Sequence, residues 1–333
     1  MNLLRTKTNF RPFTLDDAEE TVNLFNVYYQ HLFGRDEEDL NEMINEWTSP
    51  GLNLEEVTRV VEDENGRIIG YFEVWDITQP HVTKYVWAIL HPDAWNLHLY
   101  KDMLAWAESC ARERITLAPK NTRVVMSQTL PHKDKMRRTA LETYGFKLVR
   151  HFLRMEIQLN ADLAKPIIPK GLRIVPIDLD LELEAALLAT EEAFEDHWGH
   201  VKKPMKELME QWQHTIKNNE DFDPSMWFLA KDGDQIAGVC RSRGNLSEDP
   251  HFGWVNQLAV RKPWRRRGLG LALLLTAFND FHQRGYTRVG LGVDATSLTN
   301  ATQLYEKAGM HVTQQYDTYE LEIRPGHDLS TRG

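Results

Sequence analysis

The chain has 333 residues, of which 42% are hydrophobic and 26% are charged, as in globular proteins that bury sizeable cores. This length predicts two domains. Acidic residues outnumber basic ones, 49 to 39, and the net charge of -10 argues against a general attraction to nucleic acid or to an anionic membrane.

The start of the chain and its cysteines give no sign of export. The first residues, MNLLRTKTNFRPF, lack the apolar centre of a signal peptide, and no stretch reaches the roughly 18 uncharged apolar residues that cross a bilayer. Cys110 and Cys240 lie in apolar stretches, so we expect buried thiols rather than a disulfide or a metal site. The chain is therefore expected to be soluble and cytoplasmic.

The first half of the chain predicts a mixture of strands and helices. Thr58–Trp75 has the pattern of two strands joined by an acidic, Gly-containing turn, which is typical of a β-hairpin. The elements expected after it are a strand at Tyr85–Leu90, a turn at Pro92 with a long helix, a strand opening at Thr122, a short helix closing at Gly145, and an alternating strand at Phe152–Leu159.

The second half repeats these features in the same order. Met226–Arg243 predicts another hairpin, with Gly238 at the position of Gly70. The elements expected after it are a strand at Trp254–Val260, a turn at Pro263 with a long helix, a strand opening at Thr287, a short helix closing at Gly309, and a strand at Thr318–Ile323. This duplication predicts an α+β (mixed α/β) fold of two tandem domains, each a mostly antiparallel twisted sheet flanked by helices. The prolines Pro166 and Pro169 indicate a linker, which gives domains at 1–163 and 171–325, a linker at 164–170 and a tail at 326–333.

A basic, glycine-containing stretch, VRKPWRRRGLGLALLL, runs from Val260 to Leu275. Its two glycines, Gly268 and Gly270, stand where a strand gives way to a helix. The N-terminus of a helix offers unpaired N–H groups and a partial positive charge, and glycines let a phosphate approach them closely. The stretch lacks both the P-loop pattern and the third glycine of a dinucleotide-binding turn. It therefore indicates a site for one anionic ligand, although a solvated basic turn is the simpler reading of a bare run of cations.

Two motifs carry a resemblance to a known family. Arg265-x-x-Gly268-x-Gly270, after a Leu-Ala-Val strand, resembles the pyrophosphate loop of the GNAT superfamily of acyl-CoA N-acyltransferases. LYEKAGM, at Leu304–Met310, resembles the last conserved block of that superfamily. The doubled arrangement is similar to tandem GNAT proteins of the mycothiol-synthase type, and the resemblance covers most of Ile174–Ile323.

The resemblance implies a site for acyl-CoA, expected to be acetyl-CoA, in the second copy. The backbone of Leu258 and Val260 is implied to pair with the pantetheine arm, with core packing as the alternative role of these side chains. The residues implied to bind the cofactor are Leu258, Ala259, Val260, Arg265, Arg266, Arg267, Gly268, Leu269, Gly270, Leu271, Ser297 and Asn300. Tyr305 matches the tyrosine that would protonate the departing thiolate, and a buried aromatic on an amphipathic helix is the alternative.

The pattern also departs from the family. Ser297 stands where many members have an asparagine, and Asn300 lies three residues further on. Trp254 occupies the strand position that often carries a carboxylate base. The general base therefore stays open among Asp294, Glu248, His251, a water chain and an amine that arrives neutral.

The first copy lacks the basic, glycine-containing loop and the tyrosine. Opposite the basic loop it has His91–Leu104, which contains no glycine, and opposite Tyr305 it has Leu141. We therefore expect a structural or acceptor-shaping domain. The basic segment His132–Arg138 is expected to be a solvated turn and helix start, with phosphate binding as the less favoured alternative.

An acidic segment, Glu191–Pro204, stands where the superfamily shapes its acceptor pocket. Its carboxylates are Glu191, Glu192, Glu195 and Asp196. We favour a solvated acidic helix with Trp198 packed on the core over a site that attracts a cationic amine. A metal site at His197 and His200 is disfavoured because no third ligand is evident.

The sequence thus predicts an N-acetyltransferase that moves an acyl group, expected to be acetyl, from acyl-CoA to a primary amine of a small molecule by direct attack. No metal and no covalent intermediate are expected. The alternative is a catalytically weak or inactive acyl-CoA-binding sensor or scaffold. Nucleic acid and membranes are not expected as partners, and the oligomeric state stays open between a monomer with an internal pseudo-dimer and a homodimer.

Overall fold

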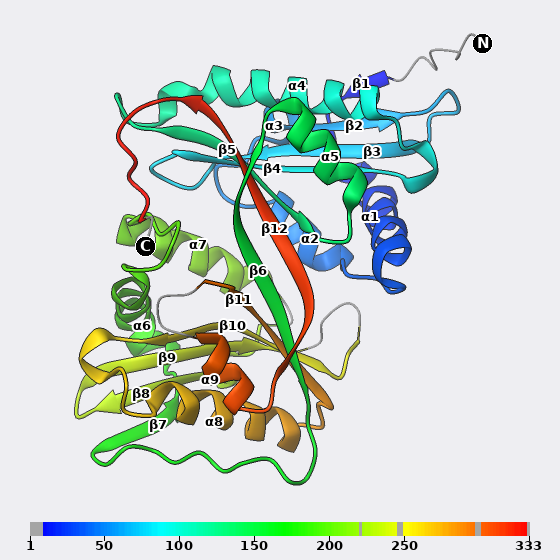
Figure 1. Ribbon diagram of the computed structural model, residues 1–333. Coiled ribbons are helices and arrows are strands. Elements are labelled where there is room, and N and C mark those ends of the chain that lie inside the picture. The colour runs from blue at the N-terminus through cyan, green and yellow to red at the C-terminus, as the bar shows by residue number, and fades with distance from the viewer. Residues whose placement is uncertain (1–8, 220–221, 245–248, 297–300, 332–333) are drawn as a thin grey trace. The chain divides into compact units, whose positions relative to one another are not determined.

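The computed structural model describes residues 9–219, 222–244, 249–296 and 301–331. The chain divides into two compact units, which are Met1–Val149 with Asp317–Leu329 (unit 1) and Arg150–Tyr316 with Ser330–Gly333 (unit 2). Both units combine helices with a mostly antiparallel sheet, which confirms the predicted mixed α/β fold (Figure 1).

The sheet of unit 1 has the strand order β1-β2-β3-β4-β5-β12, in which β4 and β5 are parallel. Its strands are β1 (Asn9–Arg11), β2 (Thr58–Glu62), β3 (Ile68–Trp75), β4 (Thr83–Leu90), β5 (Val124–Pro131) and the second part of β12 (His311–Arg324). Its helices are α1 (Ala18–Phe33), α2 (Leu40–Trp47), α3 (Leu54–Val57), α4 (Leu97–Glu113) and α5 (Lys135–Tyr144).

The sheet of unit 2 has the order β12-β6-β11-β10-β9-β8-β7, in which β10 and β11 are parallel. Its strands are β6 (Lys147–Gln158), β7 (Leu172–Pro176), β8 (Trp227–Asp232), β9 (Gln235–Arg243), β10 (Phe252–Val260), β11 (Arg288–Asp294) and the first part of β12. Its helices are α6 (Leu179–Phe194), α7 (Met205–Asn218), α8 (Leu269–Gln283) and α9 (Ala301–Lys307).

The hairpins, the Pro-containing turns and the helices predicted in each half are confirmed. Two short helices close at glycines with positive φ, Gly145 and Gly309, a conformation that glycine adopts without strain. Cys110 and Cys240 are buried free thiols, as predicted. Within the described ranges, none of the helices has the length and apolar character that a bilayer crossing requires.

The division into units differs from the predicted one, which put the boundary at residues 164–170. The change of unit falls inside β6, between Val149 and Arg150, and again inside β12, between Tyr316 and Asp317. Residues 152–158 of β6 pair with β11 of unit 2, while Asp317–Arg324 of β12 belong to unit 1. Each sequence copy thus gives part of its last strand to the sheet of the other copy. Alternating residues predict a strand but not the sheet that it joins, so the repeat alone does not disclose this exchange.

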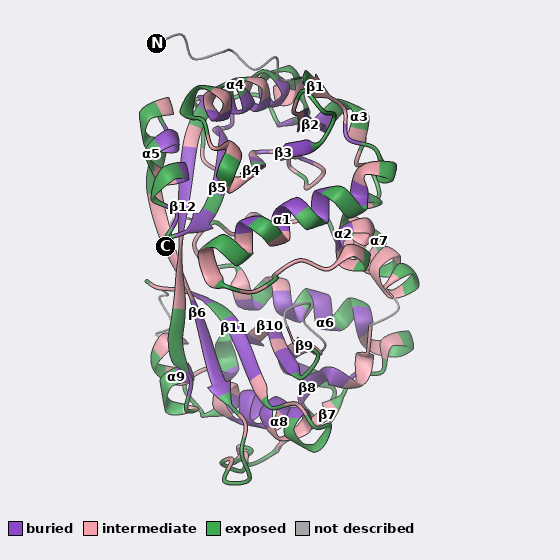
Figure 2. Cartoon of the chain, turned by 90° about the vertical axis from the view of Figure 1, so that its right-hand side faces the viewer, coloured by how far each residue is buried: buried purple, intermediate pink, exposed green. Residues whose placement is uncertain are grey.

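Two apolar cores lie on opposite faces of the unit 2 sheet. One core packs α8 and α9 against residues such as Cys240 of β9 and Leu291 of β11. The other core packs α6 and α7 against Val239 of β9 and Ala259 of β10. Figure 2 shows α6 and α8 presenting buried residues to the sheet from its two sides. Because neighbouring residues of a strand face opposite sides, β9 and β10 each contribute to both cores.

Candidate active site

The strands β10 and β11 of unit 2 pair over only part of their length. Their parallel register runs from Phe252 opposite Arg288 to Val255 opposite Leu291. The pairing of β10 with β9 then shifts at Asn256, a β-bulge, and continues from Gln257 to Val260. A bulge bends its strand and interrupts a ladder. Along residues 257–260, alternate N–H and C=O groups of β10 therefore face away from β9 without a β11 partner among the described residues.

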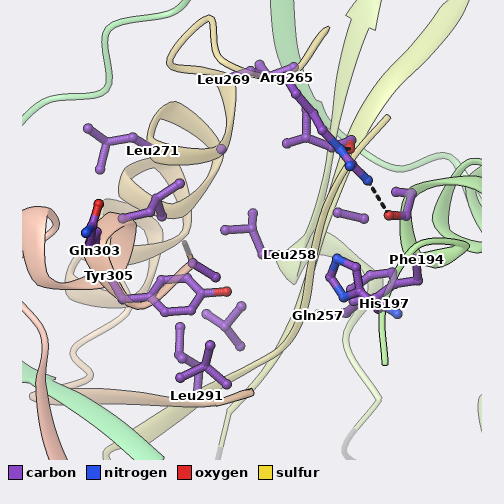
Figure 3. Close-up of a pocket in the computed structure, with 18 of the residues that line it drawn as sticks. Phe194, His197, Gln257, Leu258, Arg265, Leu269, Leu271, Leu291, Gln303 and Tyr305 are labelled. Carbon is purple, nitrogen blue, oxygen red and sulfur yellow. Dashed lines mark hydrogen bonds between the residues drawn. The ribbon is translucent and has the colours of Figure 1, made fainter. Parts of the chain in front are cut away.

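A cavity of about 620 Å³ lies at this divergence (Figure 3). Leu258 and Val260 reach it from the α8 face of the sheet, whereas Ala193, Phe194 and His197 reach it from the end of α6. The lining of the cavity therefore includes side chains from both faces of the sheet. Apart from Arg267, all the described residues that the sequence assigned to the site line it, namely Leu258, Ala259, Val260, Arg265, Arg266, Gly268, Leu269, Gly270, Leu271 and Tyr305. Ser297, Asn300 and Glu248 lie outside the described residues.

The N-terminus of α8 borders this cavity. Gly268 caps the helix with φ +82°, and a Cβ built there would meet no heavy atom within 4 Å. The first helical hydrogen bond runs from the N–H of Ala272 to the Gly268 carbonyl at 3.0 Å. The N–H groups of Leu269, Gly270 and Leu271 consequently have no acceptor within the helix, and the helix dipole adds partial positive charge. This end of α8 can bind an anion.

The five cations of the basic loop divide into two groups. Three of them form ion pairs with carboxylates near the end of α6, at 2.6 Å for Arg261–Glu192, 3.2 Å for Lys262–Glu195 and 2.6 Å for Arg265–Asp196. Arg266 and Arg267 are exposed and have no ion pair within the described part of the chain. The acidic segment, for which the sequence favours a solvated helix, instead neutralises much of the positive charge of the loop. This leaves two guanidinium groups available to a ligand.

Arg265 makes several contacts with its own chain. Its guanidinium donates to Asp196 at 2.6 Å, to the Ala193 carbonyl at 2.6 Å and to the Val260 carbonyl at 3.0 Å. Figure 3 shows the side chain turned toward the end of α6. This hydrogen bonding also lowers the pKa of Asp196. The resemblance implies that Arg265 contacts the pyrophosphate, whereas in the structure its donors tie the end of α6 to the end of β10.

Tyr305 enters the cavity from α9 (Figure 3). The side chain is buried, and burial is the main reason why its pKa is raised above the ordinary value for tyrosine. Within the described residues its hydroxyl has no hydrogen-bond partner. At neutral pH it is therefore a protonated donor, available to a group that develops negative charge in the cavity.

His197 faces the cavity from the opposite side, in the loop after α6. Its backbone N–H donates to the Phe194 carbonyl at 2.8 Å, and its ring packs edge-on against that of Phe194 with centroids 4.4 Å apart. Burial, only partly opposed by Asp196, lowers the pKa of His197. The imidazole is therefore neutral at pH 7 and can accept a proton.

The sequence did not identify His197 as a base, since its position in a loop gives no periodic signal. The sequence suggests for this histidine only a disfavoured role as a metal ligand, and no group of three or more His, Cys, Asp or Glu in the described ranges is arranged for a metal.

The other candidates for the base are placed less favourably. Asp294 lines the cavity, but the guanidinium of Arg150 binds both of its carboxylate oxygens at 2.8–3.1 Å. His251 is exposed in the turn before β10 and does not line the cavity.

In the corresponding region of unit 1, buried side chains connect the two parallel strands. There β4 and β5 pair only as far as Tyr85 and Ser127. The hydroxyl of Tyr100 bonds to the Ala88 carbonyl of β4 at 3.4 Å and to Gln128 of β5 at 3.2 Å. The buried guanidinium of Arg137 donates to this hydroxyl at 3.1 Å. Leu141, the counterpart of Tyr305, is fully buried as well.

Comparisons with known proteins agree with this geometry. Residues 187–310 match the model of the acetyltransferase (GNAT) family. A mycothiol acetyltransferase of Kocuria rhizophila is 28% identical over 190 residues, which cover 54% of this chain and 61% of that relative. A GCN5-related N-acetyltransferase structure from Sphaerobacter thermophilus has a TM-score of 0.78 and 29% identity, and the match covers 96% of this chain and 97% of that one.

A tandem GNAT protein from the clavulanic acid biosynthesis pathway shares the fold with a TM-score of 0.69, at 14% identity, over 96% of this chain and all of that one. Residues 187–310 are therefore similar to the GNAT acetyltransferase family, and the fold of the chain is similar to that of a tandem GNAT protein.

Proposed function

We propose that unit 2 is an N-acyltransferase that moves an acyl group, expected to be acetyl, from acyl-CoA to a primary amine of a small molecule. The observation that carries this proposal is the cavity at the divergence of β10 and β11, which combines an anion-binding helix end with a proton donor and a proton acceptor. The names of the relatives, an N-acetyltransferase and a mycothiol acetyltransferase, support the same class of reaction.

Different residues would bind the different parts of the acyl donor. The N–H groups from Arg266 to Leu271 and the guanidinium groups of Arg266 and Arg267, which form no ion pair with the described residues, suit the pyrophosphate. The open edge of β10, along Leu258–Val260, suits the amides of a pantetheine arm. This arrangement would hold the thioester carbonyl beside a backbone N–H, which can stabilise the oxyanion that forms on attack.

The chemistry is a direct displacement. The amine nitrogen attacks the thioester carbon, and its surplus proton passes to the neutral imidazole of His197. The tetrahedral intermediate then collapses with cleavage of the C–S bond, and the hydroxyl of Tyr305 supplies a proton to the leaving thiolate. The products are an amide and free CoA. Both Cys110 and Cys240 are buried outside the lining of the cavity and take no part. Burial raises the pKa of Cys240 to about 12, which opposes thiolate formation.

The test is to incubate the protein with acetyl-CoA and a panel of amines and to follow the release of free thiol, with CoA affinity measured separately by calorimetry. Thiol release that depends on an amine and falls in the Tyr305→Phe variant supports the proposal. CoA binding without amine-dependent thiol release from any acceptor overturns it and favours the acyl-CoA sensor.

A further inference from the structure

An arginine that forms no ion pair with the described residues lies on the α6 and α7 face of unit 2. Arg241 of β9 has its guanidinium carbon 4.4 Å from the ring centroid of Trp212 and 5.2 Å from that of Trp227. Its Nε is buried without a hydrogen-bond partner, and the described residues place no carboxylate within ion-pair distance of it. Burial lowers the pKa of Arg241 to about 10, so the group is still charged at neutral pH.

Arg241 is half-buried, and a more deeply buried arginine of the same unit has an acidic partner. This arginine, Arg154, forms an ion pair with Glu156 at 2.8 Å. A charge that loses part of its hydration without gaining a counter-ion is destabilised. The two cation–π contacts recover only part of this cost. The in-plane donors of the Arg241 guanidinium thus stay available to an anion.

A second unsatisfied polar group lies next to this arginine. Gln257 of β10 is directly opposite Arg241 in the ladder, and its Oε1 is buried without a hydrogen-bond partner. Gln257 also lines the cavity. Opposed residues of antiparallel strands have Cα atoms about 4.5–5.5 Å apart. Gln257, which lines the cavity, thus lies directly opposite a cation that has no anionic partner among the described residues, and its own buried amide oxygen also needs a partner.

We propose that the acceptor is a small amino acid or a similar amine-bearing acid, whose anionic group binds Arg241 between Trp212 and Trp227 and whose amine is held by Gln257. This inference rests on the proposed function. The short separation of the two residues fits an amine and an acid a few bonds apart. The anion offsets the half-buried charge of Arg241, and the amine nitrogen stays inside the cavity.

The experiment compares acceptors that differ in one group. With acetyl-CoA saturating, we would measure kcat/KM for β-alanine, taurine and phosphoethanolamine against ethanolamine, and for glycine against glycinamide. A charge-assisted hydrogen bond should favour the acidic member of a pair by at least about tenfold. The three acids then show whether the group is a carboxylate, a sulfonate or a phosphate.

Variants separate recognition from a structural role. Arg241→Met should bring the preference close to one, and Arg241→Lys should retain part of the preference because it keeps a charge but not the planar fork. Arg173→Met, on the exposed face of β7, is the matched control and should leave the preference unchanged. A preference for the neutral amines, or an equal loss for both members of each pair in Arg241→Met and Arg241→Lys, would overturn the inference while the proposed function stands.

A binding measurement covers the case in which no probe reacts, which would count against the proposed function alone. The ¹⁵Nε–¹H signal of Arg241, assigned by its loss in Arg241→Lys, is followed in the CoA-saturated protein during titration with N-acetylglycine and with N-acetylglycinamide. A saturable shift with the acid alone supports the inference. No shift, or the same shift with both compounds, refutes it.

Discussion

Gly268 allows the charge at the helix end to be tested separately from the shape of the loop. Because a Cβ at this position would meet no heavy atom within 4 Å, a longer side chain fits without a clash. The φ of +82° strains any other residue by about 1–2 kcal/mol. Gly268→Ala, Gly268→Gln and Gly268→Glu share this strain. Gln and Glu also share their size, so that these two differ only in charge.

The magnitude follows from Coulomb's law. Two unit charges 4 Å apart interact with about 1 kcal/mol in water and about 4 kcal/mol near a protein surface. Gly268 is exposed, so the lower part of this range, about 1–2 kcal/mol, applies to a carboxylate beside a pyrophosphate. Since about 1.4 kcal/mol corresponds to a tenfold change in Kd, Gly268→Glu should bind CoA about 5- to 30-fold more weakly than Gly268→Gln.

Calorimetry with two ligands provides the measurement. CoA carries the pyrophosphate and pantetheine does not, so the difference between the Glu and Gln variants should appear with CoA and vanish with pantetheine. It should also shrink in 0.5 M salt, because exposed charges are screened. Equal CoA affinities for the two variants would refute the assignment of the phosphate site to this end of α8, and so would an equal loss with pantetheine.

Three further changes test the remaining roles. Tyr305→Phe should leave the Kd for CoA within about twofold and lower kcat by at least about tenfold, as removal of a general acid does; an unchanged kcat would exclude this tyrosine from proton transfer. Because burial holds the pKa of His197 below its ordinary value, the base is neutral above that pKa and becomes protonated as the pH falls through it. The ratio of kcat/KM between the wild type and His197→Asn should therefore decline below about pH 6.5, whereas a ratio that is constant from pH 5 to 8 would count against His197 as the base. Trp95→Glu, in the first copy, should leave the Kd for CoA within about twofold, and a large loss measured by calorimetry on the folded variant would contradict a single site in unit 2.

The sequence predicted the elements of both units because each carries a local signal. Hairpins alternate with period two, and the glycines Gly145 and Gly309 end their helices at positive φ. The cavity lining from Leu258 to Leu271 could also be predicted from the sequence, because a strand, a glycine-containing bend and a helix follow one another within a short stretch. Features of this kind depend on neighbours in the chain.

Features that depend on distant residues were not predictable. Arg241 of β9 contacts Trp212 of α7, and the sequence of α7 contains no motif that indicates this contact. His197 reaches the cavity only because α6 ends there. The exchange of the last strands between units depends on pairing partners, which alternation does not specify. In each case the side chain acquires its role from a contact that only the folded chain makes.

The pairing of Arg265 with Asp196 shows how such a contact changes a functional assignment. If Arg265 bound the pyrophosphate directly, Arg265→Ala would weaken CoA binding and Asp196→Ala, by releasing the guanidinium, would strengthen it. If the ion pair acts by holding the end of α6 against β10, both variants should weaken catalysis to a similar extent. The double variant should then be little worse than either, because residues that act through one contact are not additive.

We expect the second pattern, with similar losses in kcat/KM for the amine and a Kd for CoA within about twofold of the wild type in all three proteins. His197 directly follows Asp196, so release of the pair moves the proposed base rather than the phosphate site. Opposite changes in CoA affinity for the two single variants would instead indicate that Arg265 binds the pyrophosphate directly.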